Sequence, residues 1–302
     1  MPSFDSLLIL GPTASGKTAL GVSLARLLGG EIISADSRQV YRGLDIGSGK
    51  DLQEFVVGGA PVAHHLIDHV DLESEYNVFQ YQRDFHNAFA AVTKKGHMPI
   101  VVGGTGLYLE AILSKTLMVT VPENPELRAE IAPMSTELLQ EKLLQLRPDV
   151  HNTTDLVDRD RLERAIEIAV HLETAVPEPA PVICPLVLGV EWDRKTLRQR
   201  IAHRLQSRIE AGLIEEVEDL LAQGCPWQRL EQLGLEYRHV ARYLRGKINN
   251  KNDLRQKLSG EICRFAKRQE TWFRRMERNG TTIHWIPEGR LDAAMAVIRD
   301  AE

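Results

Sequence analysis

The chain is poor in cysteine: its 302 residues include three, Cys184, Cys225 and Cys263, which lie far apart and form no CxxC pair. This spacing argues against a disulfide framework and against a cysteine-rich zinc site, and reduced thiols are typical of cytoplasmic proteins. No apolar run approaches the roughly 20 residues that a membrane-spanning helix needs. The first six residues contain no Lys or Arg, so they do not resemble a signal peptide. We therefore expect a cytoplasmic protein.

An excess of positive charge is also missing, because the net charge is −5. This excludes a protein that binds nucleic acid through its overall charge, although a local basic surface remains compatible with it. Apolar residues make up 43% of the chain, which is enough to build a sizeable core without disulfides or metals.

Short apolar runs alternate with segments of helical spacing through most of the chain. The runs typical of buried strands are residues 7–10, 31–34, 65–67, 99–102, 186–190 and 282–286. The segments with helical spacing are residues 18–28, 79–95, about 194–223 and about 254–278. Such alternation predicts an α/β fold, with a parallel sheet that carries helices on both faces.

The middle of the chain has a different character. Residues 121–175 are mostly polar with helical spacing, and prolines interrupt them at 122, 125, 133 and 148. A proline-rich segment, residues 177–181, follows and is typical of a stiff linker. We predict a small helical insertion over 121–175, within a core domain formed by residues 1–120 and 176–302.

One motif between the first strand and the first helix indicates phosphate binding. It fits GxxxxGK[ST] and consists of Gly11, Pro12, Thr13, Ala14, Ser15, Gly16, Lys17 and Thr18. Backbone N–H groups and the helix N-terminus attract phosphate, Lys17 adds positive charge, and the Thr18 hydroxyl is suited to Mg²⁺. A chance glycine-rich turn is the weaker interpretation in this context. The fold expected is therefore a P-loop NTPase-like parallel sheet with helices on both faces, plus the helical insertion.

The strand at 99–102 lacks the aspartate that most phosphate-loop hydrolases place at its end. Gly103-Gly104-Thr105-Gly106 follows it instead. The absence of this carboxylate argues against a motor-type ATPase or a GTPase. It favours a loop that holds a diphosphate as a leaving group.

Asp36 comes directly after the strand at 31–34. Ligands bind open α/β sheets at the carboxyl ends of the strands, so Asp36 is expected to face the phosphate loop. A lone carboxylate at this place is suited to a general base, a metal ligand or a helix N-cap, and the spacing does not decide between the functional roles and the cap.

The chain resembles the tRNA dimethylallyltransferases, which prenylate N6 of the adenosine on the 3′ side of the anticodon. The resemblance rests on the phosphate loop and on residues 33–43 (ISADSRQVYRG), 45–47 (DIG), 64–68 (HHLID), 102–108 (VGGTGLY), 161–167 (RLERAIE), 266–269 (AKRQ) and 271–273 (TWF). The Asp-Ser-x-Gln-x-Tyr and Gly-Gly-Thr-x-Leu-Tyr segments are far more specific than the phosphate loop.

The chain departs from the family pattern in three places. After Asp45-Ile46-Gly47 the family usually continues Thr-Ala-Lys-Pro, whereas residues 48–51 are Ser-Gly-Lys-Asp. Residues 171–181 replace a Gly-Lys-Pro segment, and residues 233–238 replace an Ile-Gly-Tyr-Lys-Glu-like stretch. These departures affect the expected details of RNA contact more than the chemistry.

The resemblance implies roles for individual residues. Asp36 would be the general base, Thr105 would lie near the adenine or the leaving group, and Lys17 would act on the diphosphate. Arg200 would join the phosphate loop in binding diphosphate. The residues implied in tRNA binding are Asp36, Ser37, Arg38, Gln39, Thr105, Arg128, Arg161, Arg164, Arg264 and Arg268. Mg²⁺ would be the cofactor, bound by Thr18, and a monomer would act on dimethylallyl diphosphate and a tRNA anticodon stem-loop.

A basic segment near the carboxyl end agrees with an RNA partner. Between Arg255 and Arg278 basic residues outnumber acidic ones in a chain of negative net charge, and Arg264, Arg268 and Arg275 share one helical face. Without the resemblance, a solvated basic face would be the preferred interpretation.

Three other functions are compatible with the phosphate loop. The first is a dimethylallyltransferase that acts on AMP, ADP or ATP, and the second is a small-molecule kinase. The third is a nucleotide-dependent switch without chemistry. The helical insertion and the basic helices favour a large RNA acceptor over the first, and the Arg-rich lid typical of the second is not evident in the sequence. A switch protein should prefer a nucleoside triphosphate to dimethylallyl diphosphate.

Overall fold

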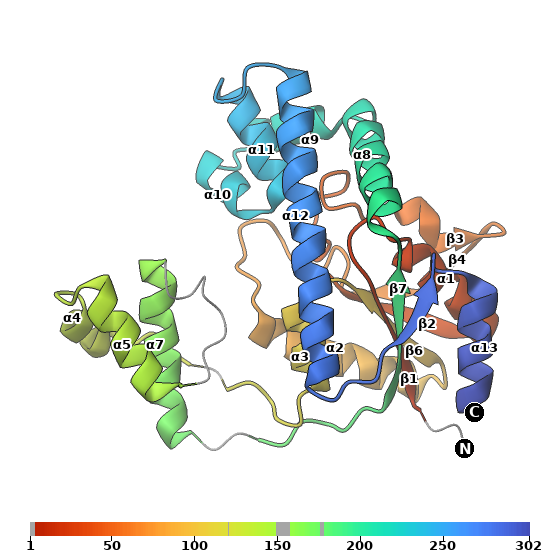
Figure 1. Cartoon of the computed structure of the whole chain (residues 1–302), viewed down its shortest axis with the longest axis horizontal. Helices are drawn as coiled ribbons and strands as arrows, with labels where there is room; N and C mark the ends of the chain where they lie inside the picture. Colours follow the sequence, from red (N-terminus) through yellow and green to blue (C-terminus); the bar gives the residue numbers. More distant parts are fainter. Residues whose placement is uncertain (1–3, 120, 149–157, 176–177) are drawn as a thin grey trace. The chain divides into compact units, whose positions relative to one another are not determined.

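The computed structural model describes residues 4–119, 121–148, 158–175 and 178–302. The chain divides into two compact units, here called the core unit (Met1–Leu113 with Val182–Glu302) and the insertion unit (Ser114–Pro181) (Figure 1). Each is described by itself. Within the described ranges, no helix combines the length and the apolar character needed to cross a bilayer.

The core unit is built on one six-stranded sheet in which all neighbouring strands run parallel. In spatial order the strands are β5 (His64–His65), β2 (Gly30–Ala35), β6 (Met98–Gly103), β1 (Ser6–Leu10), β7 (Pro185–Glu191) and β8 (His284–Pro287). The predicted α/β class and parallel sheet are confirmed. The strand predicted at 65–67 is shorter and ends before Leu66, because Leu66 and Asp68 have positive φ angles that no strand accommodates.

Helices cover both faces of this sheet. Leu7 and Ile9 face one side of β1 and share a core with α1 (Lys17–Leu28) and α13 (Leu291–Ala301). Leu8 and Leu10 face the other side, together with α2 (Val78–Lys94), α3 (Gly106–Leu113) and the carboxyl-terminal half of α12 (Lys251–Arg278). Burial on both faces explains why the strands are apolar without alternation.

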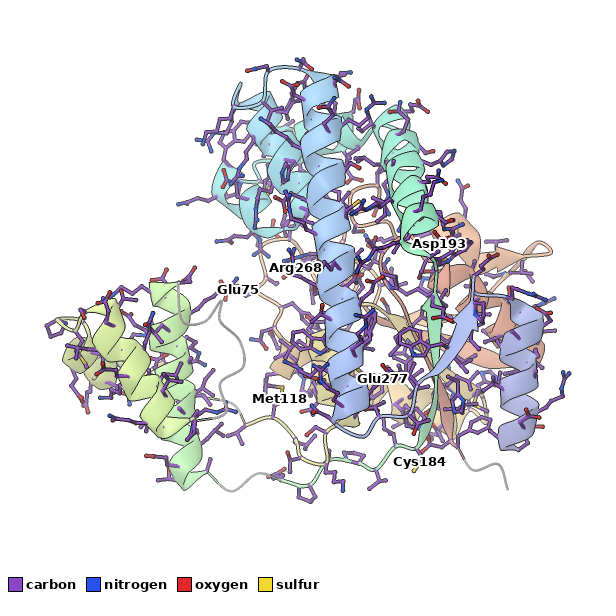
Figure 2. The ribbon with its side chains drawn as sticks, viewed as in Figure 1. Glu75, Met118, Cys184, Asp193, Arg268 and Glu277 are labelled. Atoms are coloured by element: carbon purple, nitrogen blue, oxygen red, sulfur yellow. The ribbon has the colours of Figure 1, made fainter. Side chains whose placement is uncertain are left out.

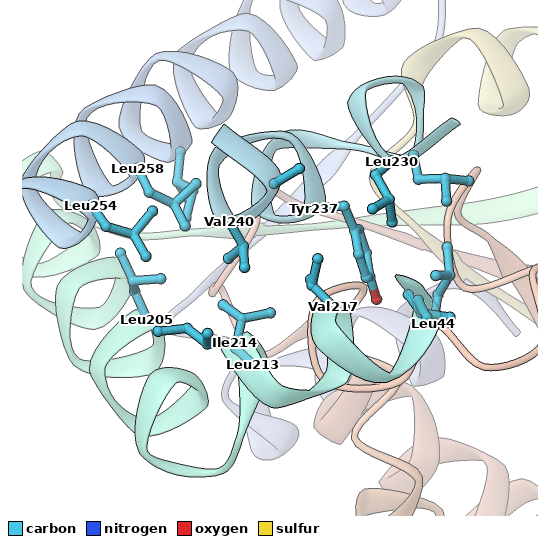
Figure 3. Packing of buried hydrophobic residues seen from close by; sticks show 14 of the residues in the cluster. Leu44, Leu205, Leu213, Ile214, Val217, Leu230, Tyr237, Val240, Leu254 and Leu258 are labelled. Atoms are coloured by element: carbon cyan, nitrogen blue, oxygen red, sulfur yellow. The ribbon is translucent and has the colours of Figure 1, made fainter. Parts of the chain in front are cut away.

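A helical subdomain packs against the segment that follows the carboxyl end of β2. Its helices are α8 (Arg194–Glu210), α9 (Leu213–Ala222), α10 (Trp227–Gln232), α11 (Leu235–Leu244) and the first half of α12. Their apolar side chains meet in one cluster with Val40, Tyr41 and Leu44, which follow β2 (Figure 3). The single helix predicted over 194–223 is wrong: Gly212, with φ of 104°, separates α8 from α9 and lets Leu213 and Ile214 turn into the cluster.

A small hairpin follows the motif at 45–51. A 3₁₀ helix (Leu52–Phe55) leads into β3 (Val56–Val57) and β4 (Ala60–Pro61), which pair antiparallel across a Gly-Gly turn. Phe55 is buried against α1 and the sheet, so the hairpin is anchored to the core unit.

The insertion unit consists of three helices, α4 (Pro125–Ile131), α5 (Thr136–Leu146) and α7 (Arg159–Thr174), in its described part. Asn124, Ser135 and Asp158 cap their N-termini through side-chain oxygens. The helices enclose a small core of their own, made of Leu127, Ile131, Leu139, Leu143, Leu162, Ile166 and Ala169.

A buried carboxylate at the start of β2 holds the opposite edge of the sheet together. The Glu31 side chain is 4% exposed and accepts hydrogen bonds from His65 and His97, both at 2.6 Å, and from Lys95 at 3.0 Å. Burial alone would raise the pKa of Glu31, but these three donors outweigh it and lower the pKa to about 2. The ionised carboxylate therefore joins β2 to β5 and to the segment before β6.

Replacing this carboxylate is expected to destabilise the core unit. Glu31→Gln should lower the free energy of unfolding at pH 7 by about 2 kcal/mol, because three donors lose a buried charged acceptor. The loss should shrink as the pH falls from about 4.5 toward 2, where wild-type Glu31 itself takes up a proton and its contribution disappears. Urea unfolding across this pH range measures both effects. Glu75→Gln, at an exposed position, should change neither, and equal effects of both variants would contradict the assignment.

Candidate active site at the carboxyl ends of the strands

The phosphate loop connects β1 to α1, as predicted. Ala14 and Gly16 have φ angles of 62° and 90°, which turn the chain tightly enough for successive backbone N–H groups to converge. The Lys17 ammonium group lies 3.5 Å from the Pro12 carbonyl, across the loop. The Ser15 hydroxyl is buried and has no hydrogen-bond partner within the described ranges, so the loop holds a donor that a phosphate oxygen could accept from.

Strand order brings three motif segments together at this edge. β6 pairs with β1 on one side and with β2 on the other, and Gly103 lies opposite both Leu10 and Ala35. A methyl group on Gly103 would overlap the Ala35 carbonyl, so glycine is required for this close pairing. The phosphate loop, Thr105 and Asp36 therefore follow the ends of neighbouring strands.

One carboxylate oxygen of Asp36 stabilises the turn that follows it in the chain. Its Oδ1 accepts from the backbone N–H groups of Arg38 at 2.8 Å and Gln39 at 3.2 Å, and so caps a turn rather than a helix. Its Oδ2 makes no hydrogen bond to any residue that the structure describes. The Thr105 hydroxyl accepts from the Ser37 N–H at 3.2 Å, which ties the two motifs together.

A small pocket opens between these segments. It is lined by Lys17, Thr18, Ile32, Ser34, Asp36, Gln39, Phe55, Ile67, Val102 and Gly103. Charged and hydroxyl groups from the phosphate loop and β2 thus share one space with four apolar side chains. The pocket therefore offers a ligand both charged groups and apolar surface.

Arg200 lies against the outside of the phosphate loop. Its Nε donates to the Ala14 carbonyl at 2.8 Å, and its guanidinium group stacks over the Trp192 ring at 4.2 Å. Trp192 in turn donates its indole N–H to the Ser15 carbonyl at 2.8 Å. The structure thus brings the predicted residue Arg200 to the loop. No sequence pattern pointed to Trp192.

A second arginine of α8 increases the positive potential at Lys17. Arg204 lies 3.5 Å from the Thr13 hydroxyl and forms an ion pair with Asp51 at 2.9 Å. Burial, followed by repulsion from Arg204, lowers the pKa of Lys17 to about 8. The spacing of Arg200, Arg204 and Arg208 at every fourth position was the sequence signal for one shared face, although only Arg200 was assigned a role.

Gln269 joins two parts of the site and was not predicted. Its Oε1 accepts from the Thr13 N–H at 2.8 Å, and its Nε2 donates to the Gly104 carbonyl at 2.8 Å. Gln269 is one of the buried residues of α12, and the other buried residues of this helix are apolar. A polar residue at a core position was the available signal.

The other predicted RNA contacts of the core unit lie in two places. Gln39 donates to the Gly49 carbonyl at 2.9 Å, and Arg38 lies beside Gly234, so both motif residues border segments that depart from the family pattern. Arg264 and Arg268 are exposed on α12, where Figure 2 shows Arg268 near the middle of the helix. Arg264 forms an ion pair with Glu261 at 2.6 Å.

Three predicted RNA contacts belong to the insertion unit. Arg128 and Arg164 both bind Glu167, at 2.8 Å and 3.0 Å, and the Glu167 side chain is fully buried. Burial would raise the pKa of Glu167, but hydrogen bonds from Arg128, the Asn124 N–H and Arg164 lower it to about 2. These two arginines therefore stabilise their unit, while Arg161 is exposed.

The site offers few protein ligands for a metal. In the described part of the chain, no group of three or more His, Cys, Asp or Glu side chains could hold an ion. Thr18 and Asp36 line the same pocket. This sparse oxygen donor set fits Mg²⁺, which commonly binds one or two protein groups and completes its shell with phosphate oxygens and water.

Comparisons with known proteins agree with this geometry. The family model described as IPP transferase matches residues 39–276, and the model described as Isopentenyl transferase matches residues 5–62. A tRNA dimethylallyltransferase 1 of Geotalea uraniireducens is 55% identical over 94% of this chain and 93% of its own length. A tRNA dimethylallyltransferase 2 of Trichlorobacter lovleyi is 57% identical over 94% of this chain and 92% of its own.

Solved structures show the same fold. The tRNA isopentenylpyrophosphate transferase of Bacillus halodurans is similar with a TM-score of 0.68 and 28% identity, over 98% of both chains. A eukaryotic dimethylallyltransferase acting on tRNA gives a TM-score of 0.77 over 95% of this chain and 74% of its own, and its 22% identity supports the fold alone. The chain therefore belongs to the IPP transferase family of tRNA dimethylallyltransferases.

Proposed function

We propose that this chain transfers the dimethylallyl group of dimethylallyl diphosphate to N6 of adenosine 37, next to the anticodon of tRNA, and releases diphosphate. The observation that carries the proposal is the pocket shared by the phosphate loop and Asp36. Its lining includes groups for both needs of the reaction, because Lys17 and Thr18 would serve a leaving diphosphate and Asp36 an amine that must lose a proton. The relatives that match nearly the whole chain bear the name of this activity.

The phosphate loop is positioned to stabilise the leaving group. As the bond between carbon 1 and the bridging oxygen breaks, its electron pair passes to the diphosphate. The loop N–H groups and Lys17 would form a fixed set of donors for this growing charge, so little reorganisation is needed during the reaction. Arg200, held at the Ala14 carbonyl, would add positive charge beside the loop. Thr18 would hold Mg²⁺, which supplies further neutralisation of the diphosphate when bound.

The apolar lining of the pocket suits the five-carbon group. Ile32, Phe55, Ile67 and Val102 belong to the buried core on the α1 side of the sheet and line the pocket beside Lys17. Their side chains exclude water from the carbon that reacts. Exclusion of water favours transfer to the amine over hydrolysis.

Asp36 is the group best placed to take the proton. The N6 amine is a weak nucleophile because its lone pair is delocalised into the adenine ring, so the proton must leave as the C–N bond forms. Oδ1 is fixed by two backbone N–H groups, while Oδ2 is available to accept from N6. The Thr105 hydroxyl, bound to the Ser37 N–H, would orient the base or the leaving group.

An RNA acceptor fits the rest of the surface. N6 is reached only when the adenosine leaves its stack, which costs little in a single-stranded anticodon loop. Ser37, Arg38 and Gln39 would contact this nucleotide, and the exposed Arg264 and Arg268 would meet the backbone phosphates. The exposed Arg161 would add a contact from the insertion unit, and the enzyme would act as a cytoplasmic monomer.

The choice of acceptor tests the proposal most directly. Anticodon stem-loops with adenosine at position 37 should be prenylated, whereas AMP and ATP should react far more slowly, because much of the binding energy would come from RNA outside the reacting base. Mass analysis of the products measures both. A stem-loop with guanosine at position 37 is the matched control. Comparable rates on AMP would instead identify an adenylate dimethylallyltransferase.

Lys17→Ala should lower the rate of transfer by at least about 10²-fold, because the leaving group loses a fixed charge. The affinity of the wild-type chain for inorganic diphosphate should also weaken as the pH rises through about 8, where free Lys17 loses its proton. Lys17→Ala should not show this pH-dependent loss of affinity, while Lys94→Ala, at an exposed position, should retain it. Calorimetric titration from pH 7 to 9 measures the affinity for diphosphate at each pH. If the loss of affinity near pH 8 persists in Lys17→Ala, Lys17 does not bind the diphosphate.

Asp36→Asn should bind both substrates but lose about 10²- to 10⁴-fold in the chemical step, the usual contribution of a positioned base. Asparagine retains a carbonyl oxygen that can cap the turn formed by residues 37–40, so the fold should be preserved. Single-turnover rates separate chemistry from binding, and thermal unfolding checks the fold. A near-normal single-turnover rate would show that Asp36 serves only as a cap.

A further inference from the structure

Arg208 is a buried cation whose hydrogen-bonding capacity is largely unused. It lies on α8 one turn beyond Arg204, and 8% of its surface is exposed. Its Nε and Nη2 atoms are buried and have no hydrogen-bond partner among the described residues. Leaving such donors unpaired costs free energy, so a ligand or water is expected to complete them.

The neighbouring carboxylates do not satisfy Arg208. Its Nη1 lies 3.6 Å from Glu236, and its Nη2 lies 3.9 Å from Asp51, both beyond hydrogen-bonding distance. Asp51 is engaged more closely by Arg204, at 2.9 Å. The free donors of Arg208 are therefore available to another acceptor.

Residue 49 must be glycine for Arg208 to take this position. A methyl group there would overlap the guanidinium of Arg208 and would also crowd that of Arg204. Gly49 is one of the departures from the family pattern, which has alanine at this place, and Asp51 replaces its proline. Both replaced residues therefore lie against arginines of α8. Gly49 leaves space for Arg208, and Asp51 forms an ion pair with Arg204.

The same region is close to the phosphate loop. Arg204 reaches both the Thr13 hydroxyl and the Gly49 carbonyl at 3.5 Å, and Gln39 donates to that same carbonyl. Both Arg204 and Arg208 contribute to lowering the pKa of Lys17, so the three cations share one electrostatic field. A phosphate group that enters this field would relieve their mutual repulsion.

We infer that Arg208, together with Arg204, forms a phosphate-binding subsite beside the phosphate loop, where Gly49 leaves room for the Arg208 guanidinium. The inference rests on the proposed function and adds a residue to it. Phosphate oxygens in this subsite come from one of two sources, the diphosphate of the prenyl donor or a backbone phosphate of the RNA acceptor.

Two kinds of variant test the subsite in the full-length chain. Arg208→Gln is made together with Glu236→Gln, so that no buried carboxylate is left without its partner, and is compared with Glu236→Gln alone. Gly49→Ala displaces the guanidinium without removing a charge. Arg198→Gln, at an exposed position of the same helix, is the matched control, and thermal unfolding confirms that each variant folds.

Binding is measured with two probes, inorganic diphosphate by calorimetry and a fluorescent anticodon stem-loop over a range of salt concentrations. If the diphosphate fills the subsite, its affinity should fall about tenfold in both kinds of variant. A variant that combines the Arg208 and Gly49 substitutions should lose no more diphosphate affinity than either one alone. If an RNA phosphate fills it, diphosphate affinity should hold and the salt dependence of stem-loop binding should flatten by about one unit. If neither affinity changes, water completes Arg208 and the inference is wrong.

Measurements on the wild-type chain would show whether the proposed function itself is wrong. In that case the wild-type chain itself would not prenylate the stem-loop, or would not bind diphosphate through Lys17. Failure of the subsite would leave wild-type activity intact and would show only as unchanged binding in the Arg208 and Gly49 variants.

Discussion

The position of β6 between β1 and β2 is the constraint on which the site depends. Each of the three strands ends in a motif, and parallel pairing at Gly103 places these ends side by side. A side chain at residue 103 would separate β6 from β2, and Asp36 would move away from Thr105. The close backbone pairing thus sets the distance between the group that would release the diphosphate and the group that would take the proton.

On the phosphate side of the site, three cations lie among the carboxylates of Asp36, Asp51, Glu54 and Glu236. Lys17, Arg204 and Arg208 lie close enough to influence one another, and Asp51 pairs closely with Arg204 alone. A bound diphosphate would bring further negative charge to these three cations and would reduce the repulsion among them. Binding the prenyl donor would therefore stabilise the helical subdomain as well as the loop.

The sequence predicted those features that depend on local pattern, and missed those that depend on packing. Short, uninterrupted apolar runs identified the strands because burial on both faces requires them, and the phosphate loop was found because its function needs a fixed spacing. The break at Gly212, between α8 and α9, was missed because Arg194 to Gln223 has helical spacing throughout, so only the packing of Leu213 and Ile214 reveals it. Gln269 was missed because its two partners, Thr13 and Gly104, lie far away in the sequence.

Asp36 shows why a cap and a base are not exclusive interpretations of one carboxylate. The turn formed by residues 37–40 needs an acceptor, and Oδ1 supplies it through two hydrogen bonds. The same bonds fix the plane of the carboxylate, and therefore the direction in which Oδ2 accepts. A base that is held in this way loses little entropy when the amine arrives, so the capping interaction would itself contribute to the rate. The structural role of Asp36 is thus part of its proposed chemistry rather than an alternative to it.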